Sequence, residues 1–551
     1  MVGATTYDDR YTEVMKTFED LKETRERYES VWKQINDLVL PRRSDFDWSK
    51  THIVKPNRKI YDPLPGYLAR KAADGLLGNT MSRGNIWFRL HADNPNLDQM
   101  RAFRMHAEEV EYILYALLRN STMYEAAHDS CVDALTVGHS VLYRETHPET
   151  GRLIYTARHP KEVWLGQNRW GQIDTIARKF FMEAREVVSE YRDDGTLPER
   201  FITSAGVAPY DRVSLIHIVR PRKDRDVTKS DKWNMEYESL TVLEDHGALI
   251  REGGFKRFPY PAVWRWRTNT GEVYARSPSY DALPDIIRLQ EIAKTMMEFV
   301  QEQARPSRMY PLEMKGKIDF RPGGMTPYTD PSRRVYRMFE AQNAYPLGKD
   351  LIEQLRDQIS EAYYADVFTL LSMNMDTTRT ATEVQELTAE RSALLTAVSE
   401  RFTNEYMVPV IRDLYHYADE EGLLPPVPEA LKDYDLSTSI EFLGPLAQNQ
   451  RRSFLNTGIN ASLNHFASAA QLWPEVLDQV DPAKFGRYGA IVTGLSEKVL
   501  RSKREVEQIQ QAREQQQAQQ AQMEAMQQQA SAMAQATKAP EPGSLGEEMM
   551  E

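Results

Sequence analysis

Cysteine is almost absent from this sequence, since Cys131 is the only one in 551 residues. One cysteine excludes an intrachain disulfide, a CxxC redox pair and a zinc site built from several cysteines, and it suits a reducing interior. Long apolar runs are missing too, because no stretch approaches the roughly 20 apolar residues that a membrane-spanning helix needs. Residues 1–20 contain no apolar core of a signal peptide. We therefore expect a soluble protein that is not secreted through a signal peptide.

An excess of positive charge is also lacking. The chain has 69 Lys and Arg against 81 Asp and Glu, which gives a net charge of −12 at pH 7. The overall charge therefore does not hold the protein on nucleic acid or on an anionic membrane, and any contact with DNA must be local or must avoid tight binding. The sequence does contain 41% hydrophobic residues. At this length they suffice for roughly three or four domains with a sizeable core.

Periodicity in the first half of the chain predicts helices followed by strands. Apolar residues recur at helical spacing over 11–40, 66–77, 99–120 and 123–137. After Gly138 the period changes to two, which predicts strands at 141–145, 153–158, 163–165, 173–182, 213–219, 234–243 and 248–252. Turn signals such as those at 148–151 and 245–247 separate the strands. The region is therefore predicted to be antiparallel and not a βαβ sheet.

The second half is predicted to be mainly helical. An apolar stripe predicts a helix over 283–300, and the segment 304–348 then breaks the pattern with six prolines and four glycines. This segment has a local charge of +4, from eight Lys and Arg minus four acidic residues. Further helices are predicted over 349–368, 381–419 and 447–473, and from near residue 497, with a polar loop at 372–381. The whole pattern predicts an α+β fold that is predominantly helical.

The C-terminal arm is rich in glutamine, which provides 13 of the 28 residues from 508 to 535. Gln and Ala are good helix formers but supply little apolar face. We expect this arm to be helical only beside neighbouring arms and to be disordered alone.

Three motifs that could carry catalysis or bind a ligand are incomplete. Residues 138–142 (Gly-His-Ser-Val-Leu) begin like a nucleophile elbow but lack its second Gly and its parallel sheet. Residues 75–84 lack the Lys-Ser/Thr pair of a phosphate-binding loop, so a helix end and a turn are expected there. His128 and Cys131 share a helix face, yet no second ligand pair has metal spacing. We expect no enzyme, no metal site and no cofactor.

Basic side chains gather in two places. For residues 220–225 (Arg-Pro-Arg-Lys-Asp-Arg) a solvated face is favoured, and contact with an acidic partner is the alternative. The second group lies in the segment 304–348, whose charge is opposite to that of the chain, which favours a surface for an acidic partner or for phosphates. Its members are Arg308, Lys315, Lys317, Arg321, Arg333, Arg334 and Arg337.

Several short sequence motifs are spread over nearly the whole chain. Each is weak alone, but the order in which they occur together is specific for one protein family. They are residues 28–41 (YESVWKQINDLVLP), 60–62 (IYD), 76–82 (LLGNTMS), 87–90 (WFRL), 271–278 (GEVYARSP), 282–286 (ALPDI), 380–384 (TATEV), 444–447 (GPLA) and 500–506 (LRSKREV). With the order helix, irregular insertion, helix, polar loop and long helix, they resemble the head-to-tail connector, or portal, proteins of short-tailed (podovirus-type) bacteriophages. One departure is Ala275, where the family's Tyr-Gly-Arg-Ser-Pro pattern has Gly. It affects only the local turn geometry, because a left-handed conformation costs Ala more than Gly.

The resemblance implies a portal-protein fold with wing, stem, clip and crown, assembling as a closed ring of twelve subunits around an axial channel for double-stranded DNA. Such a ring lies at one capsid vertex of the virion, is assembled in the host cytoplasm, and serves DNA packaging and ejection. The implied partners are the other subunits of the homododecamer, DNA in transit, the major capsid protein, the scaffolding protein, the terminase large subunit and the tail adaptor or tail tube proteins. The alternative function is a non-portal virion scaffold or adaptor protein, which sustained heptads would favour.

The resemblance also implies a division of the chain and its site residues. The expected parts are wing 1–277, stem helix 278–303, clip 304–348, stem helix 349–369, tunnel loop 370–380, inner wing with the long helix 381–443, crown 444–507 and Gln-rich arm 508–551. The tunnel-loop residues expected to face the DNA channel are Asn374, Asp376, Thr377, Thr378 and Arg379. The basic set of 304–348 is expected to be the docking surface of the clip. Arg379 would contact one phosphate per subunit, and an ion pair with Glu383 at i+4 is the alternative.

Overall fold

The computed structural model describes residues 7–41, 60–192, 196–229, 231–304, 308–309, 312, 336–337, 344–365, 400–432, 434, 438–442, 466, 468, 486 and 503–536. The chain divides into two compact units, residues 1–94 with 106–454 and residues 95–105 with 455–551. All sheets among the described residues lie in the first unit. No helix in the described ranges is long and apolar enough to cross a membrane.

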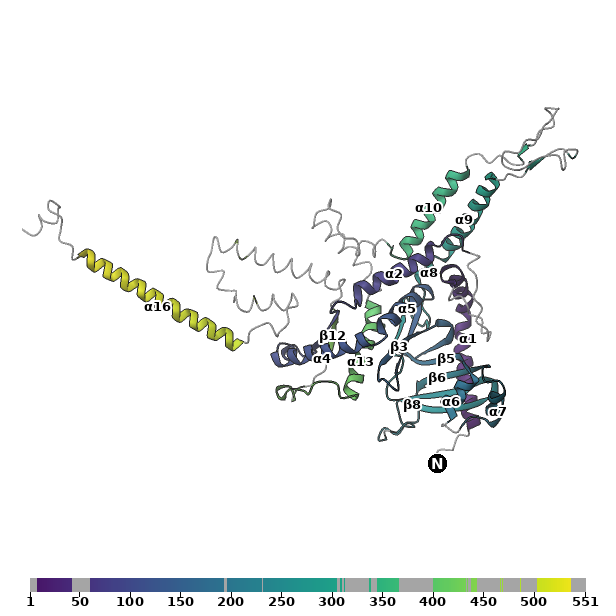
Figure 1. Ribbon diagram of the computed structural model, residues 1–551, viewed down its shortest axis with the longest axis horizontal. Helices are drawn as coiled ribbons and strands as arrows, with labels where there is room; N and C mark the ends of the chain where they lie inside the picture. The colour runs from purple at the N-terminus through teal and green to yellow at the C-terminus, as the bar shows by residue number, and fades with distance from the viewer. Residues whose placement is uncertain are drawn as a thin grey trace, which may run out of the picture. The chain divides into compact units, whose positions relative to one another are not determined.

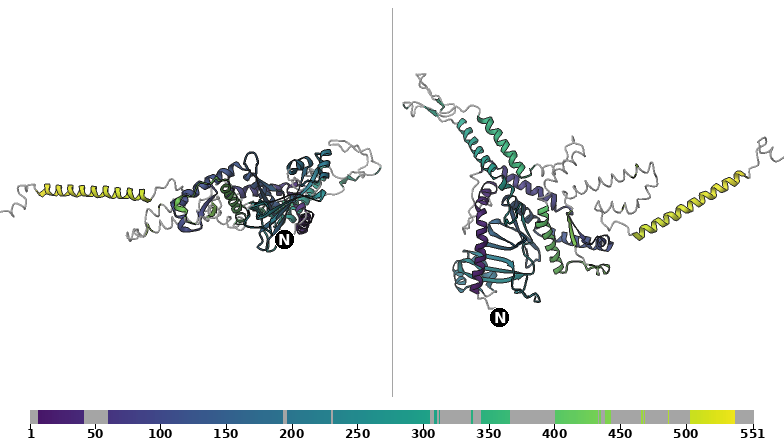
Figure 2. Two further views of the ribbon diagram at one scale, coloured as in Figure 1. Left: turned by 90° about the horizontal axis from the view of Figure 1, so that it is seen from below. Right: turned by 180° about the vertical axis from the view of Figure 1, so that it is seen from behind.

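The chain opens with the long helix α1 (Tyr7–Val39), which runs along the sheets of the first unit (Figure 1; Figure 2, right). The predicted apolar stripe is its buried face, where the Phe18 ring meets the Trp164 ring edge-on at 4.9 Å. Between these apolar residues lies the buried Arg25, whose guanidinium stacks 4.2 Å from the centre of the Trp164 ring. Its Nη1 donates to the Val163 carbonyl at 2.8 Å, and its Nε lies 2.9 Å from the Glu29 carboxylate one turn further on, so the sheet and α1 together stabilise this charge.

A five-stranded sheet confirms the predicted antiparallel region. Its order is β4 (Val163–Gln167), β5 (Ile173–Glu183), β6 (Arg212–Pro221), β7 (Tyr237–Leu243) and β8 (Ala248–Phe255), with antiparallel pairs throughout. The short helices α6 (Ala184–Tyr191) and α7 (Glu199–Val207), which the sequence pattern did not predict, pack on the end of this sheet through Val187 and Phe201.

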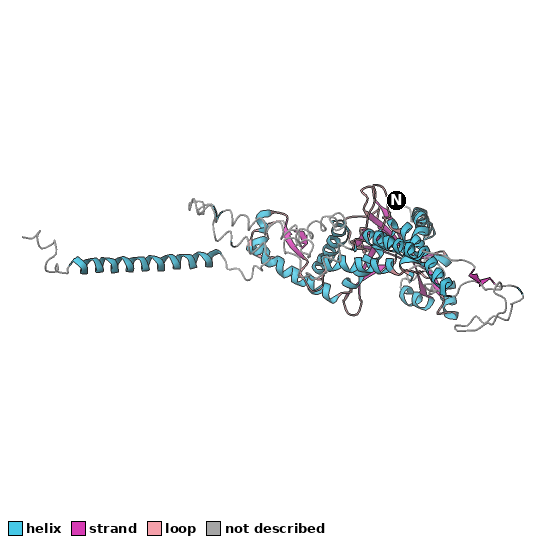
Figure 3. Ribbon diagram, turned by 90° about the horizontal axis from the view of Figure 1, so that it is seen from above, coloured by secondary structure: helices cyan, strands magenta, loops and turns pink. Residues whose placement is uncertain are grey.

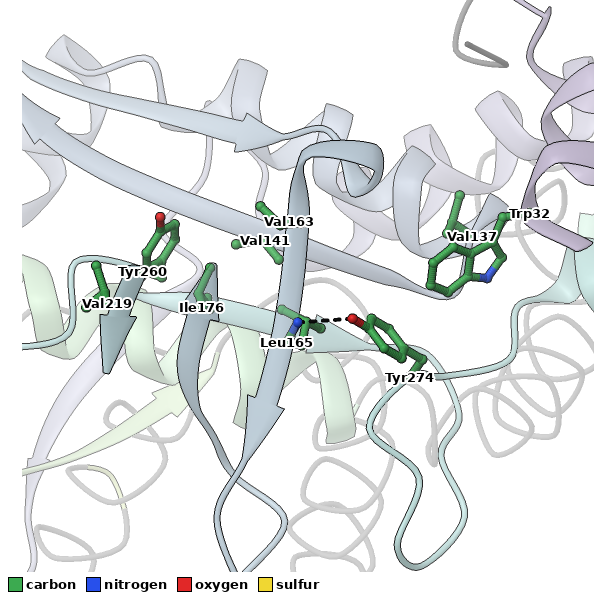
Figure 4. Close-up of a cluster of buried hydrophobic side chains, with 9 residues drawn as sticks. All are labelled: Trp32, Val137, Val141, Val163, Leu165, Ile176, Val219, Tyr260 and Tyr274. Carbon is green, nitrogen blue, oxygen red and sulfur yellow. Dashed lines mark hydrogen bonds between the residues drawn. The ribbon is translucent and has the colours of Figure 1, made fainter. Parts of the chain in front are cut away.

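A second sheet has the order β3 (Leu153–Arg158), β2 (His139–Thr146) and β9 (Ala262–Arg265). Strands β2 and β3 were predicted, whereas the four-residue β9 was not. The helix α5 (Met123–Thr136) leads into β2 and packs against α2 (Leu64–Thr80). Buried side chains from α1 and both sheets form one cluster, in which the Leu165 amide donates to the Tyr274 hydroxyl at 3.0 Å (Figure 4). The two sheets and α1 therefore share one core.

Strand β1 (Phe88–Ala92) pairs with the distant strand β12 (Thr438–Phe442), and neither was predicted. The helix α4 (Arg101–Asn120) covers this ribbon, since the Tyr115 hydroxyl bonds the amides of Trp87 and Phe88 at 2.8 and 2.7 Å. The Glu111 carboxylate accepts from the Leu90 amide at 2.7 Å, and its burial raises the pKa of this carboxyl to about 7. The four-residue helix α3 (Pro95–Asp98) belongs to the second unit.

The predicted helix 283–300 is α9 (Leu283–Ala304), preceded by the short α8 (Pro278–Asp281). Two-residue strands follow, β10 (Arg308–Met309) and β11 (Tyr336–Arg337), and then α10 (Ala344–Ala362). The prediction of 349–368 was wrong at both ends of α10. The helix begins five residues earlier because Pro346 is tolerated in a first turn, and it ends before Tyr364, whose φ of 55° is left-handed.

The predicted long helix is confirmed over the part that is described. Residues 400–402 are helical, a π-helical turn η6 covers Thr403–Met407, and α13 covers Val408–Glu420. Single-turn 3-10 helices lie at η2 (Pro160–Glu162), η4 (Glu244–His246) and η7 (Glu429–Leu431). In the second unit, α16 (Lys503–Ala536) is one continuous helix over most of the glutamine-rich arm (Figure 3). The predicted helix 447–473 lies outside the described residues, apart from Phe466 and Ser468.

Candidate functional site

Helices α9 and α10 lie side by side and project from the first unit (Figures 1 and 2). We refer to them as the paired helices. They run antiparallel, because the chain reverses between them through the antiparallel pair β10–β11. At Gly348 on α10 the approach is so close that an added Cβ would collide with the Met296 sulfur on α9. Glycine therefore lets the two backbones approach closely near their outer ends.

Burial of the paired helices falls along their length. Near the base, Ile286, Leu289, Leu355 and Ile359 are at most 4% exposed. Towards the outer end of α9, Met297 and Val300 are 45% and 49% exposed. The sequence pattern predicted Val300 as part of one apolar stripe with Ile286 and Leu289. A single subunit thus covers only the inner part of that stripe.

The paired helices have a net negative charge, since their sequences contain eight acidic and four basic residues, a balance of −4. Each basic side chain has an acidic partner. The pairs are Arg288–Asp285 (3.3 Å), Lys294–Glu298 (3.8 Å), Lys349–Glu353 (3.6 Å) and Arg356–Asp62 (2.9 Å). Among the residues that the structure describes, Glu291, Asp350, Asp357 and Glu361 have no ion pair. The accessible charge of these helices is therefore carboxylate.

The base of the paired helices is held by the short segment 60–62. Gln290 on α9 accepts from the Tyr61 and Asp62 amides at 2.7 and 2.9 Å and donates to the Asp62 carbonyl at 2.8 Å. On α10, both Nε and Nη2 of Arg356 donate to Oδ2 of the Asp62 carboxylate, at 3.0 and 2.9 Å. The other oxygen of that carboxylate accepts from the Leu64 amide at 2.9 Å, at the start of α2. One buried aspartate thus connects α2, α9 and α10.

A second junction ties the paired helices to α5. The Ser277 hydroxyl caps α8 by accepting from the Tyr280 amide at 2.9 Å, and it donates to the Thr136 carbonyl at 2.7 Å. The Ser279 hydroxyl donates to the Leu135 carbonyl at 2.8 Å, so the buried Tyr363 hydroxyl donates to Ser279 at 2.5 Å. Burial raises the pKa of Tyr363, which keeps it a neutral donor. Both helices are therefore fixed at their base, next to α5.

Comparisons of the sequence with known proteins match nearly the whole chain. The profile of the family described as bacteriophage head to tail connecting protein matches residues 11–500. The chain belongs to this connector family. It is similar to the "Probable portal protein" of Bordetella phage BPP-1, with 27% identity over 90% of this chain and 89% of that protein. It is also similar to the "Portal protein" of Salmonella phage epsilon15, with 27% identity over 91% of this chain and 90% of that protein.

Most residues that the connector resemblance implied as functional lie outside the described part of the chain. This holds for Asn374, Asp376, Thr377, Thr378 and Arg379, and for Lys315, Lys317, Arg321, Arg333 and Arg334. Arg308 and Arg337 are described as backbone only, and they lie directly opposite each other in the β10–β11 pair. Two predicted members of the basic set are thus brought together at the end of the paired helices.

The basic cluster 220–225 of this connector is divided: Lys223, Asp224 and Arg225 are exposed, as predicted for a solvated face, whereas Arg220 and Arg222 bind within the fold. Arg220 forms ion pairs with Glu13 on α1, at 2.6 Å, and with Glu238 on β7. The Arg222 side chain is 6% exposed and donates to the Gly253 carbonyl at 3.0 Å. Both alternatives from the sequence were wrong for these two residues, because their guanidinium groups bind α1 and the neighbouring strands to β6.

Residues of the incomplete catalytic motifs form a turn or lie buried in the fold. Gly138 is a turn with φ of 103°, and an added Cβ would collide with the Ala275 carbonyl oxygen. The His139 side chain that follows is fully buried, which lowers its pKa to about 3. Cys131 is buried as well, and burial raises the pKa of its thiol. Among the described residues, no group of three or more His, Cys, Asp and Glu could hold a metal ion.

Sequence reasoning missed the anchor formed by Asp62, Gln290 and Arg356. One signal was present, because Gln290 lies four residues after Ile286 and so falls on the apolar face of α9. A polar residue on a buried face needs a hydrogen-bonding partner. The sequence did not indicate that the backbone of 61–62 would supply it.

Proposed function

We propose that the protein is a phage portal, the head-to-tail connector through which double-stranded DNA enters the capsid during packaging and leaves during ejection. The observation that carries this proposal is the match of the connector family to residues 11–500. The two curated relatives are named as portal proteins and align over about nine-tenths of both chains. In this function the protein is structural and has no enzymatic role, and it lies at the portal vertex of the virion.

The functional unit is a ring of twelve identical subunits. A head-to-tail interface closes into a ring when the rotation that relates one subunit to the next is a whole fraction of a full turn. Such an interface needs exposed apolar side chains, and the paired helices offer Ile287, Met297, Val300 and Leu351, which are 36 to 49% exposed. In the ring these side chains meet neighbouring subunits. A lone subunit then lacks the contacts that complete its outer stripe.

The paired helices form the stem that surrounds the DNA channel. Because their basic side chains are paired and their remaining charges are carboxylates, this surface repels phosphates. Twelve subunits of charge −12 sum to −144. Basic side chains that contact phosphates release counterions and would hold the DNA tightly. An acidic wall makes no such contacts and lets the DNA slide.

The remaining parts follow the order of the chain. Residues 1–277 and 381–443 form the wing, 304–348 the clip, 370–380 the tunnel loop, 444–507 the crown and 508–551 a C-terminal arm. The tunnel loop faces the DNA, with Arg379 as its phosphate contact. Procapsids that contain Arg379→Ala are expected to assemble but to package or retain less DNA. Unchanged packaged length would assign Arg379 to the ion pair with Glu383.

The clip docks the terminase large subunit and later the tail adaptor, while the wing contacts the major capsid and scaffolding proteins. The basic set with Arg308 and Arg337 at its base steers acidic partners by charge. Adaptor binding is then expected to weaken strongly with salt. Equal affinity for the adaptor in low and high salt would show that charge does not drive this docking.

The experiment that tests the ring is the native mass of the purified protein by light scattering, with negative-stain images of the same peak. Twelve subunits of 63.6 kDa give 12 × 63.6 = 763 kDa. A particle of that mass with a central hole supports the proposal. A stable 63.6 kDa monomer that forms no ring when co-expressed with scaffold and capsid proteins overturns it.

A further inference from the structure

Two arginines face the core that the two sheets share, one from each sheet. Arg158 ends β3 and lies directly opposite Val141, and Arg178 lies in β5 directly opposite Val163. Residues paired across two strands project on the same side of a sheet. Both valines belong to the buried cluster between the sheets (Figure 4). The two arginine side chains therefore start from the facing sides of the two sheets, next to η2, which joins β3 to β4.

One carboxylate is bound to this pair of cations. Both Nε and Nη2 of Arg178 donate to Oε2 of Glu162 at 3.3 Å, and Nη1 of Arg178 takes no part in that ion pair. The Arg158 guanidinium stacks 4.4 Å from the centre of the Tyr143 ring. In the part of the chain that the structure describes, Arg158 forms no hydrogen bond and no ion pair through its side chain. Its charge is therefore not balanced by a bound carboxylate.

The groups around the two arginines do not supply the missing negative charge. Burial, and then the charge of Arg178, lowers the pKa of Arg158. Arg178 lies directly opposite His217, a ring whose burial, with the charges of both arginines, lowers its pKa to about 3 and keeps it neutral. Glu145, a further carboxylate that acts on Arg158, is exposed. A buried excess of positive charge costs free energy unless an anion compensates it.

Buried donors without a partner lie at the same place. They are Nε of Arg158 and the hydroxyl of Tyr260, and neither has a hydrogen-bond partner among the described residues. The Tyr260 ring lies 5.1 Å from the Tyr143 ring, on which Arg158 stacks. Burial raises the pKa of Tyr260, so its hydroxyl keeps the proton that it can donate. With Nη1 of Arg178, strands β3 and β5 and the segment before β9 thus offer three donors.

We propose that Arg158, Arg178 and Tyr260 bind a small oxyanion, with the chemistry of inorganic phosphate, between the two sheets. Guanidinium groups form charge-assisted hydrogen bonds with oxyanions, and the separate oxygens of a tetrahedral anion accept from several donors at once. The bound anion balances the charge of Arg158 and connects the three-stranded sheet to the five-stranded sheet. The inference goes beyond the proposed portal function and does not depend on it.

The test is isothermal titration calorimetry of the full-length protein with inorganic phosphate, in a chloride buffer of constant ionic strength. The wild type is expected to bind with a saturable heat, at one site per subunit, and to melt at a higher temperature in millimolar phosphate. Arg158→Met keeps the length of the side chain and removes its charge. It is expected to lower the affinity for phosphate at least about tenfold, the effect of one charge-assisted hydrogen bond.

Two further measurements separate binding from folding. In phosphate-free buffer, Arg158→Met is expected to melt no lower than the wild type, because it removes a buried cation that no carboxylate balances. Tyr260→Phe removes only the hydroxyl. It is expected to weaken phosphate binding by a smaller factor than Arg158→Met and to leave the melting temperature in chloride unchanged.

The matched control is Arg169→Met. Arg169 also stacks on an aromatic ring, 4.1 Å from the centre of the Trp170 ring, but it is exposed in the turn between β4 and β5. The control is expected to bind phosphate like the wild type. Absence of saturable binding by the wild type, or equal affinity in Arg158→Met and the control, overturns the inference and leaves water as the partner of these donors.

If Arg158→Met does not fold, the outcome depends on Tyr260→Phe, and an unchanged affinity of that variant overturns the inference. Phosphate binding is measured on the purified protein without DNA, capsid or adaptor. A failure of this proposal is therefore distinct from a failure of the portal function, which the ring and DNA packaging test.

Discussion

In the five-stranded sheet, Ile216, Ile218 and Val242 are fully buried, whereas on α9 Met297 and Val300 are about half exposed. We call the described residues of the first unit outside 283–362 the body. The body encloses its own core, formed by α1 and two sheets. The paired helices are held at their base, where Asp62 binds Gln290 and Arg356 and where Tyr363 bonds Ser279. The body thus has a core of its own, while the outer part of the paired helices leaves apolar side chains exposed, which neighbouring subunits would cover in the proposed ring.

The largest difference is expected between a core truncation in the body and one at the outer end of α9. Ile216→Ala removes a fully buried side chain between α1 and the sheet, which costs about 2 to 5 kcal/mol of unfolding free energy. Val300→Ala, at 49% exposure, is expected to cost less than about 0.5 kcal/mol in the free subunit. Urea unfolding of both variants measures this. Similar losses in the free subunit would show that the outer helix is already enclosed.

The body is also expected to respond to pH through Glu111. Burial raises the pKa of this carboxyl from 4.5 to about 7 in the folded protein. The folded state then binds a proton that the unfolded state releases, so its contribution to stability is full below pH 4.5 and is lost as the pH rises through 7. At about 1.4 kcal/mol per pKa unit the loss is up to roughly 3 kcal/mol. Glu111→Gln should flatten the unfolding free energy between these pH values, and an unchanged slope would contradict the assignment.

The anchor is expected to matter more than any exposed pair on the paired helices. Asp62→Asn keeps the shape of a side chain that is 3% exposed but removes the charge that Arg356 binds. Because Arg356 is half exposed and can be solvated, a loss of about 1 to 3 kcal/mol is expected. The matched control Asp285→Asn breaks the exposed pair with Arg288 and should change stability by less than about 0.5 kcal/mol. Equal melting curves for the two variants would rule out the anchor.

The smallest effect is expected at Lys294, whose pair with Glu298 is 51% and 62% exposed. Lys294→Ala should lower the unfolding free energy by less than about 0.5 kcal/mol, and the difference should vanish near 1 M salt, where the screening length is about 3 Å. Urea unfolding at low and high salt measures it. An effect that persists in high salt would place this pair in a more enclosed site than the structure gives it.

The sequence predicted the elements that carry a long periodic pattern. Strands β2 to β8 alternate over enough residues to be recognised, and α1 repeats its stripe over nine turns' worth of chain. The four residues of β9 are too short for a period to appear, and β1 and β12, with five residues each like β4, lie between predicted helices instead of within the run of strands. The partner of β1 lies in the distant segment Thr438–Phe442, and no local pattern encodes that pairing.

The site was predictable only in outline. The order of helices and the basic insertion pointed to the paired helices, but not to the anchor, because Gln290 and Arg356 act through the backbone and carboxylate of a segment more than 200 residues away. The contact between Thr268 and Arg401 is likewise long-range, because the two residues are 133 positions apart in the chain. Pro409 was a local signal for the π-helical turn, since a proline inside a helical pattern disturbs the turn before it.

The most direct test of the proposed portal function is a cryo-electron microscopy reconstruction of the purified ring. The account predicts twelve copies of the paired helices around the axis, with the carboxylates of Glu291, Asp350, Asp357 or Glu361 facing the channel and the Arg356–Asp62 pair intact at the base of each copy. A ring whose channel is lined by the body, with the paired helices on its outer surface, would contradict it.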